Sequence, residues 1–274
     1  MAAYLRLFIV VVVLSPVTFV LMPVQYLAII FFPAISRKIP LYWHRLALKL
    51  VGTKVFVRGQ LPKEKPLLIV VNHLSWSDIL VLGSVMELCF IAKDEVKSWP
   101  GINVLARLQR TVFVNRGKRS DSGNQVNSVA ARLLEGDRMV LFAEGTTGSG
   151  HQVAPFKSAL FGAAQYALKE SHLETVTVQP VAIAYTHLFG MPLGRYHQTQ
   201  ASWPGDIPLG PHLINFLKKG AYDVEIVFGE PLVINSETSR REIARTTEKR
   251  VSAMFQKAMR GDYINGVDTG GTEK

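Results

Sequence analysis

The chain has 274 residues, of which 48% are hydrophobic and 19% charged, so it is not disordered and can hold one sizeable α/β domain with an accessory segment. Its formal net charge of +10 favours anionic partners, such as lipid headgroups or phosphorylated substrates. The sequence has no zinc-finger spacing, no RNA-binding aromatic signature and no long basic run, which argues against nucleic acid as a partner.

The first element is an apolar segment from Leu7 to Ser36 that contains no Asp, Glu, Lys or Arg. It exceeds both the roughly 20 residues of a membrane-spanning helix and the roughly 7–15 residues of a signal-peptide core. Three prolines interrupt it, and an interior proline kinks a helix. One kinked transmembrane helix and a hairpin of two helices dipping into one leaflet both fit this pattern, with an uncleaved signal peptide as a further interpretation. We predict a membrane anchor over residues 1–39.

Basic residues are concentrated on one side of this segment. Four lie between positions 37 and 49, whereas only Arg6 precedes it. The positive-inside rule therefore predicts that the body of the protein lies on the cytoplasmic face of the cell inner membrane. The single cysteine, Cys89, cannot form an internal disulfide and lies in an apolar run, as expected for a buried thiol in a reducing compartment.

After the anchor, short apolar runs alternate with helical patterns. The expected strands are Lys54–Val57, Leu67–Val71, Leu88–Ala92, Thr111–Val114, Met139–Phe142, Val176–Ala184 and Val224–Phe228. The expected helices are Leu41–Val51, Ile79–Val85, Asn103–Leu108, Asn124–Leu134, Lys157–Leu168 and Glu237–Met259. Continuous apolar strands between helices predict an α/β domain, over residues 40–262, whose sheet is covered on both faces. We interpret Leu188–Pro211 as a long surface excursion and residues 263–274 as a disordered tail.

One run carries the candidate chemistry. It ends the buried strand Leu67–Val71 with His73 and begins a helix at Asp78, and sites in open α/β sheets are built at the carboxyl ends of strands. Within one helix these two residues would lie about 140° apart, but a strand–loop–helix corner can bring the carboxylate to one imidazole nitrogen. Such a pair can take a proton from an alcohol. Spacing alone also fits a loop histidine and a first-turn aspartate favoured by the helix dipole.

Three further blocks follow this pair in order. N-H-L-S-W-S-D at Asn72–Asp78 is followed by T-V-F-V-N-R at Thr111–Arg116, by F-A-E-G-T-T at Phe142–Thr147 with P-F-K at Pro155–Lys157, and by V-Q-P-V-A-I at Val178–Ile183. With these blocks the chain resembles the glycerolipid acyltransferase family, which includes lysophosphatidic acid acyltransferases. The resemblance implies a mixed, largely parallel sheet of about seven strands flanked by helices, as in glycerol-3-phosphate acyltransferases.

The resemblance also implies a reaction. A fatty acyl group passes directly from a carrier thioester, on acyl-carrier protein or acyl-CoA, to the hydroxyl of a lysolipid. His73 is then the general base and Asp78 its orienting partner, with no cofactor and no metal. The sequence contains no G-x-S-x-G nucleophile elbow, so nothing in it contradicts direct attack.

Several other residues are expected to bind substrate. The glycine-rich loop that begins at Gly145 and Thr146, after Glu144, lets backbone N–H groups approach a polar or anionic headgroup. Arg116 and Lys157 are candidates for binding acidic headgroup or carrier phosphates. Flexible-turn and surface-charge roles are the alternatives for these residues.

The chain departs from the family where an arginine commonly follows Glu-Gly-Thr, because Thr147 stands there. A neutral hydroxyl in place of a bidentate guanidinium weakens binding of a phosphate by about 1.5–3 kcal/mol. Bacterial acyltransferases that convert lyso-ornithine lipid to ornithine lipid resemble this variant. We therefore expect lyso-ornithine lipid as the acceptor, with lysophosphatidic acid, and hence 1-acyl-sn-glycerol-3-phosphate acyltransferase activity, as the alternative.

Two other function classes compete with this hypothesis. A non-enzymatic membrane protein would use its positive charge to bind anionic lipid, and His73 and Asp78 would then be dispensable. A lipid hydrolase would use the same pair to activate water.

Overall fold

The computed structural model describes residues 2–61, 63, 65–114, 122–162, 164–165, 168, 174–205 and 207–265. Its strands are β1 Lys54–Arg58, β2 Leu67–Val71, β3 Cys89–Lys93, β4 Val112–Val114, β5 Arg138–Phe142, β6 Val176–Leu188, β7 Met191–Pro192, β8 Tyr222–Phe228 and β9 Leu232–Ile234. Its α-helices are α1 Ala2–Phe31, α2 Pro33–Val51, α3 Asp78–Val85, α4 Ile102–Leu108, α5 Ser122–Leu134, α7 Gly194–His197, α8 Leu209–Lys219, α9 Arg240–Arg260 and α10 Asp262–Asn265. Short 3₁₀ helices are η1 Asp94–Ser98, η3 Ser158–Phe161 and η4 Gln198–Gln200.

The described strands form one sheet in the order β1-β8-β6-β2-β5-β3-β4, with β7 and β9 added to β6. β2 is parallel to both β5 and β6, and β3 is parallel to β5 and β4. β8 is parallel to β1 but antiparallel to β6. The prediction of a mixed, largely parallel sheet is confirmed. It has nine described strands rather than about seven, because β7 and β9 are two and three residues long and too short to give a strand pattern.

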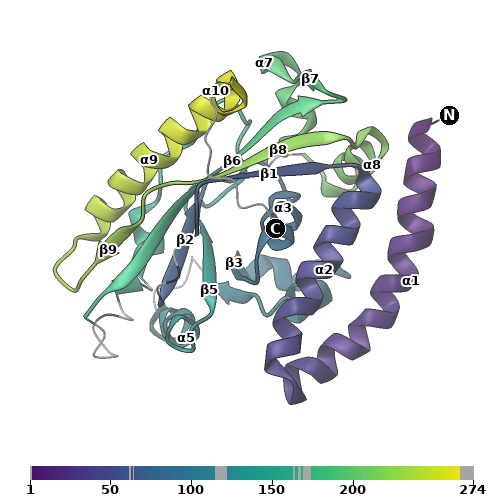
Figure 1. The fold of residues 1–274 in the computed structure, drawn as a ribbon. Helices are drawn as coiled ribbons and strands as arrows, with labels where there is room; N and C mark the ends of the chain where they lie inside the picture. The colour runs from purple at the N-terminus through teal and green to yellow at the C-terminus, as the bar shows by residue number, and fades with distance from the viewer. Residues whose placement is uncertain are drawn as a thin grey trace.

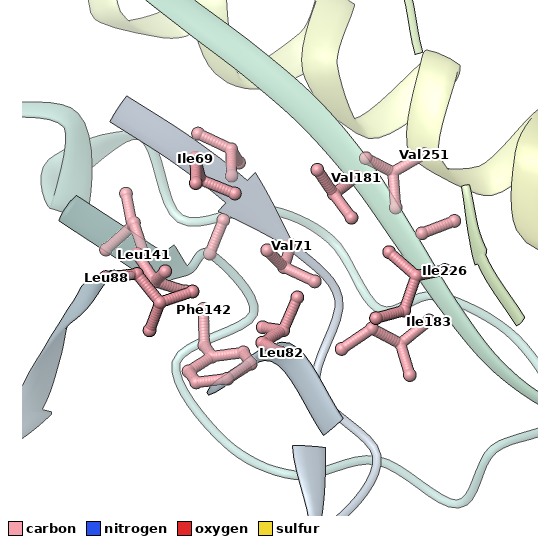
Figure 2. Close-up of a cluster of buried hydrophobic side chains, with 14 of the residues drawn as sticks. Ile69, Val71, Leu82, Leu88, Leu141, Phe142, Val181, Ile183, Ile226 and Val251 are labelled. Carbon is pink, nitrogen blue, oxygen red and sulfur yellow. The ribbon is translucent and has the colours of Figure 1, made fainter. Parts of the chain in front are cut away.

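The centre of the sheet is buried on both faces. All five residues of β2 are buried, as expected for a strand whose side chains have no solvent-facing side. Helix α9 packs against β6 and β8, while α1, α2 and α3 lie together on the other side of the molecule (Figure 1). Figure 2 shows Val71 and Phe142, at the ends of β2 and β5, beside Leu82 of α3. This core holds the carboxyl ends of β2 and β5 next to each other.

Most of the apolar N-terminal segment is one helix, α1, which forms a hairpin with the following amphipathic helix α2. Helix α1 continues through Pro16 and Pro23, the chain breaks at Phe32, and Pro33 starts α2 in the first-turn position that a proline tolerates. The two helices pack side by side (Figure 1). The stretch Ala3–Phe31 is long and apolar enough to cross a membrane, by length and composition. Helix α2 begins eight residues before the expected Leu41.

Two expectations about the C-terminal half need correction. Leu188–Pro211 is not a plain surface excursion, because it contains β7, α7 and η4 and buries Gln198 and Ser202 completely. Helix α8 was not predicted, since glycine and proline open it. The helix expected over Lys157–Leu168 begins with the short 3₁₀ helix η3, and the described residues after it, 162, 164, 165 and 168, are α-helical. Of the tail 263–274, residues 266–274 lie outside the described residues.

Candidate active site

Asn72 fixes the point where β2 ends. Its side-chain Nδ2 donates to the carbonyl of Ile183 on β6 (3.0 Å), and its Oδ1 accepts the N–H of the same residue (2.9 Å). The side-chain amide thus takes the place of one further pair of backbone hydrogen bonds between β2 and β6. The backbone is released from the sheet directly afterwards, so His73 begins a loop at a fixed position.

The loop from His73 to Asp78 wraps around the aspartate carboxylate. Oδ2 of Asp78 accepts the N–H groups of Leu74 (2.7 Å) and Ser75 (2.9 Å) and lies 2.8 Å from Nδ1 of His73. Asp78 is the first residue of α3 and is completely buried, whereas the His73 side chain keeps 17% of its surface exposed. The strand–loop–helix corner therefore brings together the two residues predicted to carry the chemistry.

This geometry sets the tautomer of His73. An ionised carboxylate only accepts hydrogen bonds, so the proton between the two side chains belongs to Nδ1 of the imidazole. In the neutral ring, Nε2 then carries a lone pair and can accept a proton. The imidazole stacks on Phe142, with ring centroids 3.8 Å apart and planes 17° apart, which fixes the plane of the ring.

Glu144 connects the first and third sequence blocks. Its Oε1 accepts the backbone N–H of His73 (2.9 Å), and its Oε2 accepts the N–H of Ala154 (3.2 Å). Burial raises the pKa of the Glu144 carboxyl to about 7, against the two backbone hydrogen bonds, which lower it, while the charges of Asp78 and Glu248 raise it further. Glu144 thus positions the backbone of His73.

The glycine-rich loop closes over the same region. Gly145 turns the chain with φ +74° after β5, in the left-handed region that favours glycine. The N–H of Gly148 donates to the carbonyl of His73 (2.8 Å). His73 is therefore held through both its backbone N–H and its carbonyl by the block that begins at Glu144.

The remaining residues predicted to bind substrate are Thr146, Thr147, Lys157 and Arg116. Thr146 is exposed and Thr147 is half-buried, and both lie in the loop between Glu144 and Gly148. The backbone N–H of Lys157 donates to the carbonyl of Ala143 (2.9 Å), which anchors the loop, and its side chain is exposed. Arg116 lies outside the described residues.

Part of the segment expected to be a surface excursion packs on the loop between His73 and Asp78. The N–H of Trp203 donates to the carbonyl of Leu74 (2.7 Å). Trp76 donates through Nε1 to Nδ1 of His212 (3.0 Å), whose Nε2 lies 2.9 Å from the carbonyl of Ser202. This arrangement requires a neutral His212, in agreement with the lowering of its pKa by burial. The segment therefore packs against the loop between His73 and Asp78.

Sequence reasoning missed Tyr185 of β6. Its buried hydroxyl lies 3.0 Å from Oδ1 of Asp78 and 2.6 Å from Oγ of Ser77. The available signal was a tyrosine two residues after the apolar, proline-bearing block V-Q-P-V-A-I. The strand pairing that places it behind Asp78 was not visible in the sequence.

Cys89 takes no part in this site. It lies at the start of β3, where Nη2 of Arg132 donates to its sulfur (3.2 Å), and burial raises the pKa of its thiol. Because β3 and β5 are parallel, Cys89 lies near the amino-terminal ends of these strands, whereas His73 follows the carboxyl-terminal end of β2. The prediction of a buried thiol is confirmed.

Known proteins are similar to this chain in sequence and in fold. A family model described as Acyltransferase matches residues 54–184. A lyso-ornithine lipid O-acyltransferase of Brucella abortus is 48% identical over 264 residues, which cover 96% of this chain and 99% of that protein. A protein of the same name from Rhizobium meliloti is 46% identical, over 89% of this chain and 84% of that protein.

A solved structure agrees with the fold. The crystal structure of the 1-acyl-sn-glycerophosphate acyltransferase PlsC from Thermotoga maritima superimposes with a TM-score of 0.57 at 21% identity, over 89% of this chain and 97% of that chain. At that identity the likeness supports the fold alone. The full-length similarity to the two bacterial relatives carries the assignment: this chain is an enzyme and belongs to the acyltransferase family.

Proposed function

We propose that this acyltransferase moves a fatty acyl group from acyl-carrier protein or acyl-CoA to the free hydroxyl of lyso-ornithine lipid, which gives ornithine lipid. The two relatives that match most of the chain carry this activity in their names. Thr147 supports the same acceptor, because ornithine lipid has no phosphomonoester to pair with the missing arginine.

The observation that carries the chemistry is the 2.8 Å contact between His73 Nδ1 and Asp78 Oδ2. The acceptor hydroxyl gives its proton to Nε2 of His73 while its oxygen bonds to the thioester carbonyl carbon. The tetrahedral intermediate collapses with cleavage of the carbon–sulfur bond. The imidazolium returns the proton to the departing thiolate, and Asp78 stabilises the imidazolium between the two steps. Glu144 and the loop at Gly145 and Thr146 border the acceptor, and Arg116 and Lys157 bind acidic groups of donor or acceptor.

The alternative acceptor is lysophosphatidic acid, because the four sequence blocks are shared with enzymes that acylate it. We propose it second, since Thr147 offers this phosphate one hydroxyl where the family commonly offers a guanidinium.

We propose that the hairpin of α1 and α2 holds the enzyme against the cytoplasmic face of the inner membrane, with residues 1–39 as anchor and residues 40–262 as the acyltransferase domain. Three polar side chains of α1 turn inward. Arg6 donates to carbonyls at the end of α8, Thr18 accepts from Trp43, and Gln25 donates to the carbonyls of Ser36 (2.9 Å) and Leu108 (2.7 Å). The side chains on the opposite face are apolar and exposed.

This packing favours a helix that lies along one leaflet over one that crosses the bilayer. Helix α1, about 45 Å long, packs against α2, α8 and α4. These neighbours carry charged residues, including Arg45, Lys49 and Lys218, which the hydrocarbon core of a bilayer disfavours.

The decisive experiment offers the purified protein lyso-ornithine lipid and lysophosphatidic acid side by side, with labelled acyl-carrier protein or acyl-CoA as donor. We expect faster acylation of lyso-ornithine lipid and no transfer by His73→Ala, which should remain folded and membrane-bound. A clear preference for lysophosphatidic acid would overturn the acceptor. Full turnover by His73→Ala would overturn the mechanism, and release of free fatty acid without acceptor would indicate a hydrolase.

A further inference from the structure

A tyrosine stands behind the catalytic pair, on the far side of Asp78 from His73. Tyr185 is fully buried on β6, and its hydroxyl lies 3.0 Å from Oδ1 of Asp78, the carboxylate oxygen that His73 does not use. The same hydroxyl lies 2.6 Å from Oγ of Ser77. Neither the relatives nor the sequence blocks assign a role to this residue.

The direction of these hydrogen bonds follows from the groups involved. Burial, and after it the charge of Asp78, raise the pKa of Tyr185 well above its ordinary value, so the phenol keeps its proton. An ionised carboxylate can only accept, so the phenol proton points to Asp78. The Ser77 hydroxyl is then the donor to the phenol oxygen. The chain of donors runs from Ser77 through Tyr185 to Asp78.

With Tyr185, Asp78 receives four hydrogen bonds within the site. Oδ2 accepts from the His73 ring and from the backbone N–H groups of Leu74 and Ser75, and Oδ1 accepts from Tyr185. Three of the four donors come from the catalytic loop itself. Tyr185 is the one that comes from the sheet, so it ties the rotation of the carboxylate to the rigid core.

We propose that Tyr185 is a positioning residue of the acyl-transfer reaction: its buried hydroxyl fixes the rotation of the Asp78 carboxylate and shares its negative charge, so that Oδ2 stays aligned with Nδ1 of His73. The inference rests on the proposed function of His73 and Asp78 as the proton-transferring pair. Tyr185 acts through Asp78 and does not touch the substrate.

Loss of the hydroxyl should change catalysis in two ways. In Tyr185→Phe, Oδ1 of Asp78 is buried without its donor, so the carboxylate is free to rotate away from the imidazole. Where it still faces His73, its charge is no longer shared, and it holds a proton on His73 more strongly. The rate of proton transfer falls, and the neutral imidazole appears only at higher pH.

The chain offers a matched control in Tyr222. It is also fully buried, lies on the neighbouring strand β8 with its ring centroid 6.1 Å from that of Tyr185, and donates its hydroxyl to the backbone carbonyl of Gln200 (3.0 Å). Tyr222→Phe removes the same atom from the same aromatic cluster without touching Asp78. Any effect that the two variants share is structural.

The test measures kcat, KM and the pH profile of kcat/KM for the full-length protein with labelled acyl-carrier protein and lyso-ornithine lipid. For Tyr185→Phe we expect kcat to fall about tenfold or more, KM to stay within about twofold, and the acidic limb of the profile to move up by about one pH unit. For Tyr222→Phe we expect an unchanged profile. Equal losses in both variants with unmoved profiles, or wild-type kinetics in Tyr185→Phe, would overturn the proposal.

Two additional proteins keep the result interpretable. His73→Ala in the same assay tests the proposed function separately: activity there refutes the catalytic pair, whereas its inactivity beside a fully active Tyr185→Phe refutes only the role of Tyr185. If Tyr185→Phe fails to fold, 3-fluorotyrosine at position 185 keeps the shape and donates more strongly. The acidic limb should then move to lower pH, and an unmoved limb would overturn the proposal.

Discussion

The backbone N–H of His73 donates to Oε1 of Glu144 across 2.9 Å, which ties the residue that follows β2 to the loop that follows β5. The two residues are 71 positions apart, and they meet because β2 and β5 pair in parallel and end side by side. The block at Phe142–Thr147 thus holds the backbone of the block at Asn72–Asp78 in place.

Glu144 predicts a pH dependence of stability. Its pKa in the folded protein is about 7, above the ordinary 4.5, because burial disfavours the charged form. Because this pKa is raised on folding, Glu144 contributes about 3 kcal/mol to the free energy of unfolding at low pH. This contribution is complete below pH 4.5 and is lost as the pH rises through 7. Thermal unfolding of wild type and Glu144→Gln from pH 4.5 to 8 should show wild type losing stability relative to the variant. A difference that stays constant with pH would contradict this.

Gly150 is predicted to be required for the packing of the glycine-rich loop. A Cβ at this position would lie 2.7 Å from Cγ of Gln198 and 3.1 Å from Cδ2 of Leu74, the residue that follows His73. Gly190 provides the control, since it has nearly the same φ (+78° against +79°) but no atom within 4 Å of a built Cβ. Gly150→Ala should lose about 1–3 kcal/mol more than Gly190→Ala in thermal unfolding and should also lose activity. Identical losses would show that only backbone strain matters.

Asp137 is predicted to stabilise the fold without serving catalysis. Its buried carboxylate contacts Nη2 of Arg37 (3.1 Å), Nη2 of Arg110 (3.2 Å) and Nε of Arg132 (2.7 Å), which ties the hairpin and α5 to the start of β5. Removing one partner of a buried ion pair costs about 3 kcal/mol. We expect Asp137→Asn to unfold at lower urea concentration but to keep its activity per folded molecule, because Asp137 lies at the opposite end of β5 from the site.

A surface aspartate serves as the control for that prediction. Asp262 pairs with Arg260 at 3.1 Å, and its side chain is 48% exposed, so Asp262→Asn should change stability by less than about 1 kcal/mol. A large loss of activity in folded Asp137→Asn would show that the ion cluster acts on the site.

Thr147 is predicted to set the preference between acceptors. Thr147→Arg restores the charged, bidentate group that the family commonly uses, so kcat/KM for lysophosphatidic acid should rise about tenfold relative to lyso-ornithine lipid. Gln152→Arg adds the same charge at an exposed position beyond the glycine-rich loop and should leave the ratio nearly unchanged. Equal ratios in both variants would assign the effect to net charge.

The sequence by itself determined the class of fold and the order of its main elements. The five apolar residues of β2 predicted a strand buried on both faces, since no polar side chain is present to face water. It also predicted that His73 and Asp78 meet, as they do, because the block that contains them lies at a strand–helix corner, where the end of β2 and the start of α3 are signalled locally. The length and apolarity of α1 were equally visible, and one helix through its prolines was among the two interpretations that the pattern allowed.

Only the tertiary structure decided how these parts meet. Helix α8 has Gly210 and Pro211 in its first turn, and packing of Phe216 overrides that weak local signal. In segment 198–203, Gln198, Ala201 and Ser202 are buried, and the N–H of Trp203 donates to the carbonyl of Leu74, although the composition of the segment is typical of a surface loop. Glu144 and Tyr185 reach His73 and Asp78 only through strand pairing. Such pairing depends on the burial of a shared sheet, which no local pattern records. The sequence alone therefore predicted that His73 and Asp78 form a pair, but not the residues that hold the pair in place.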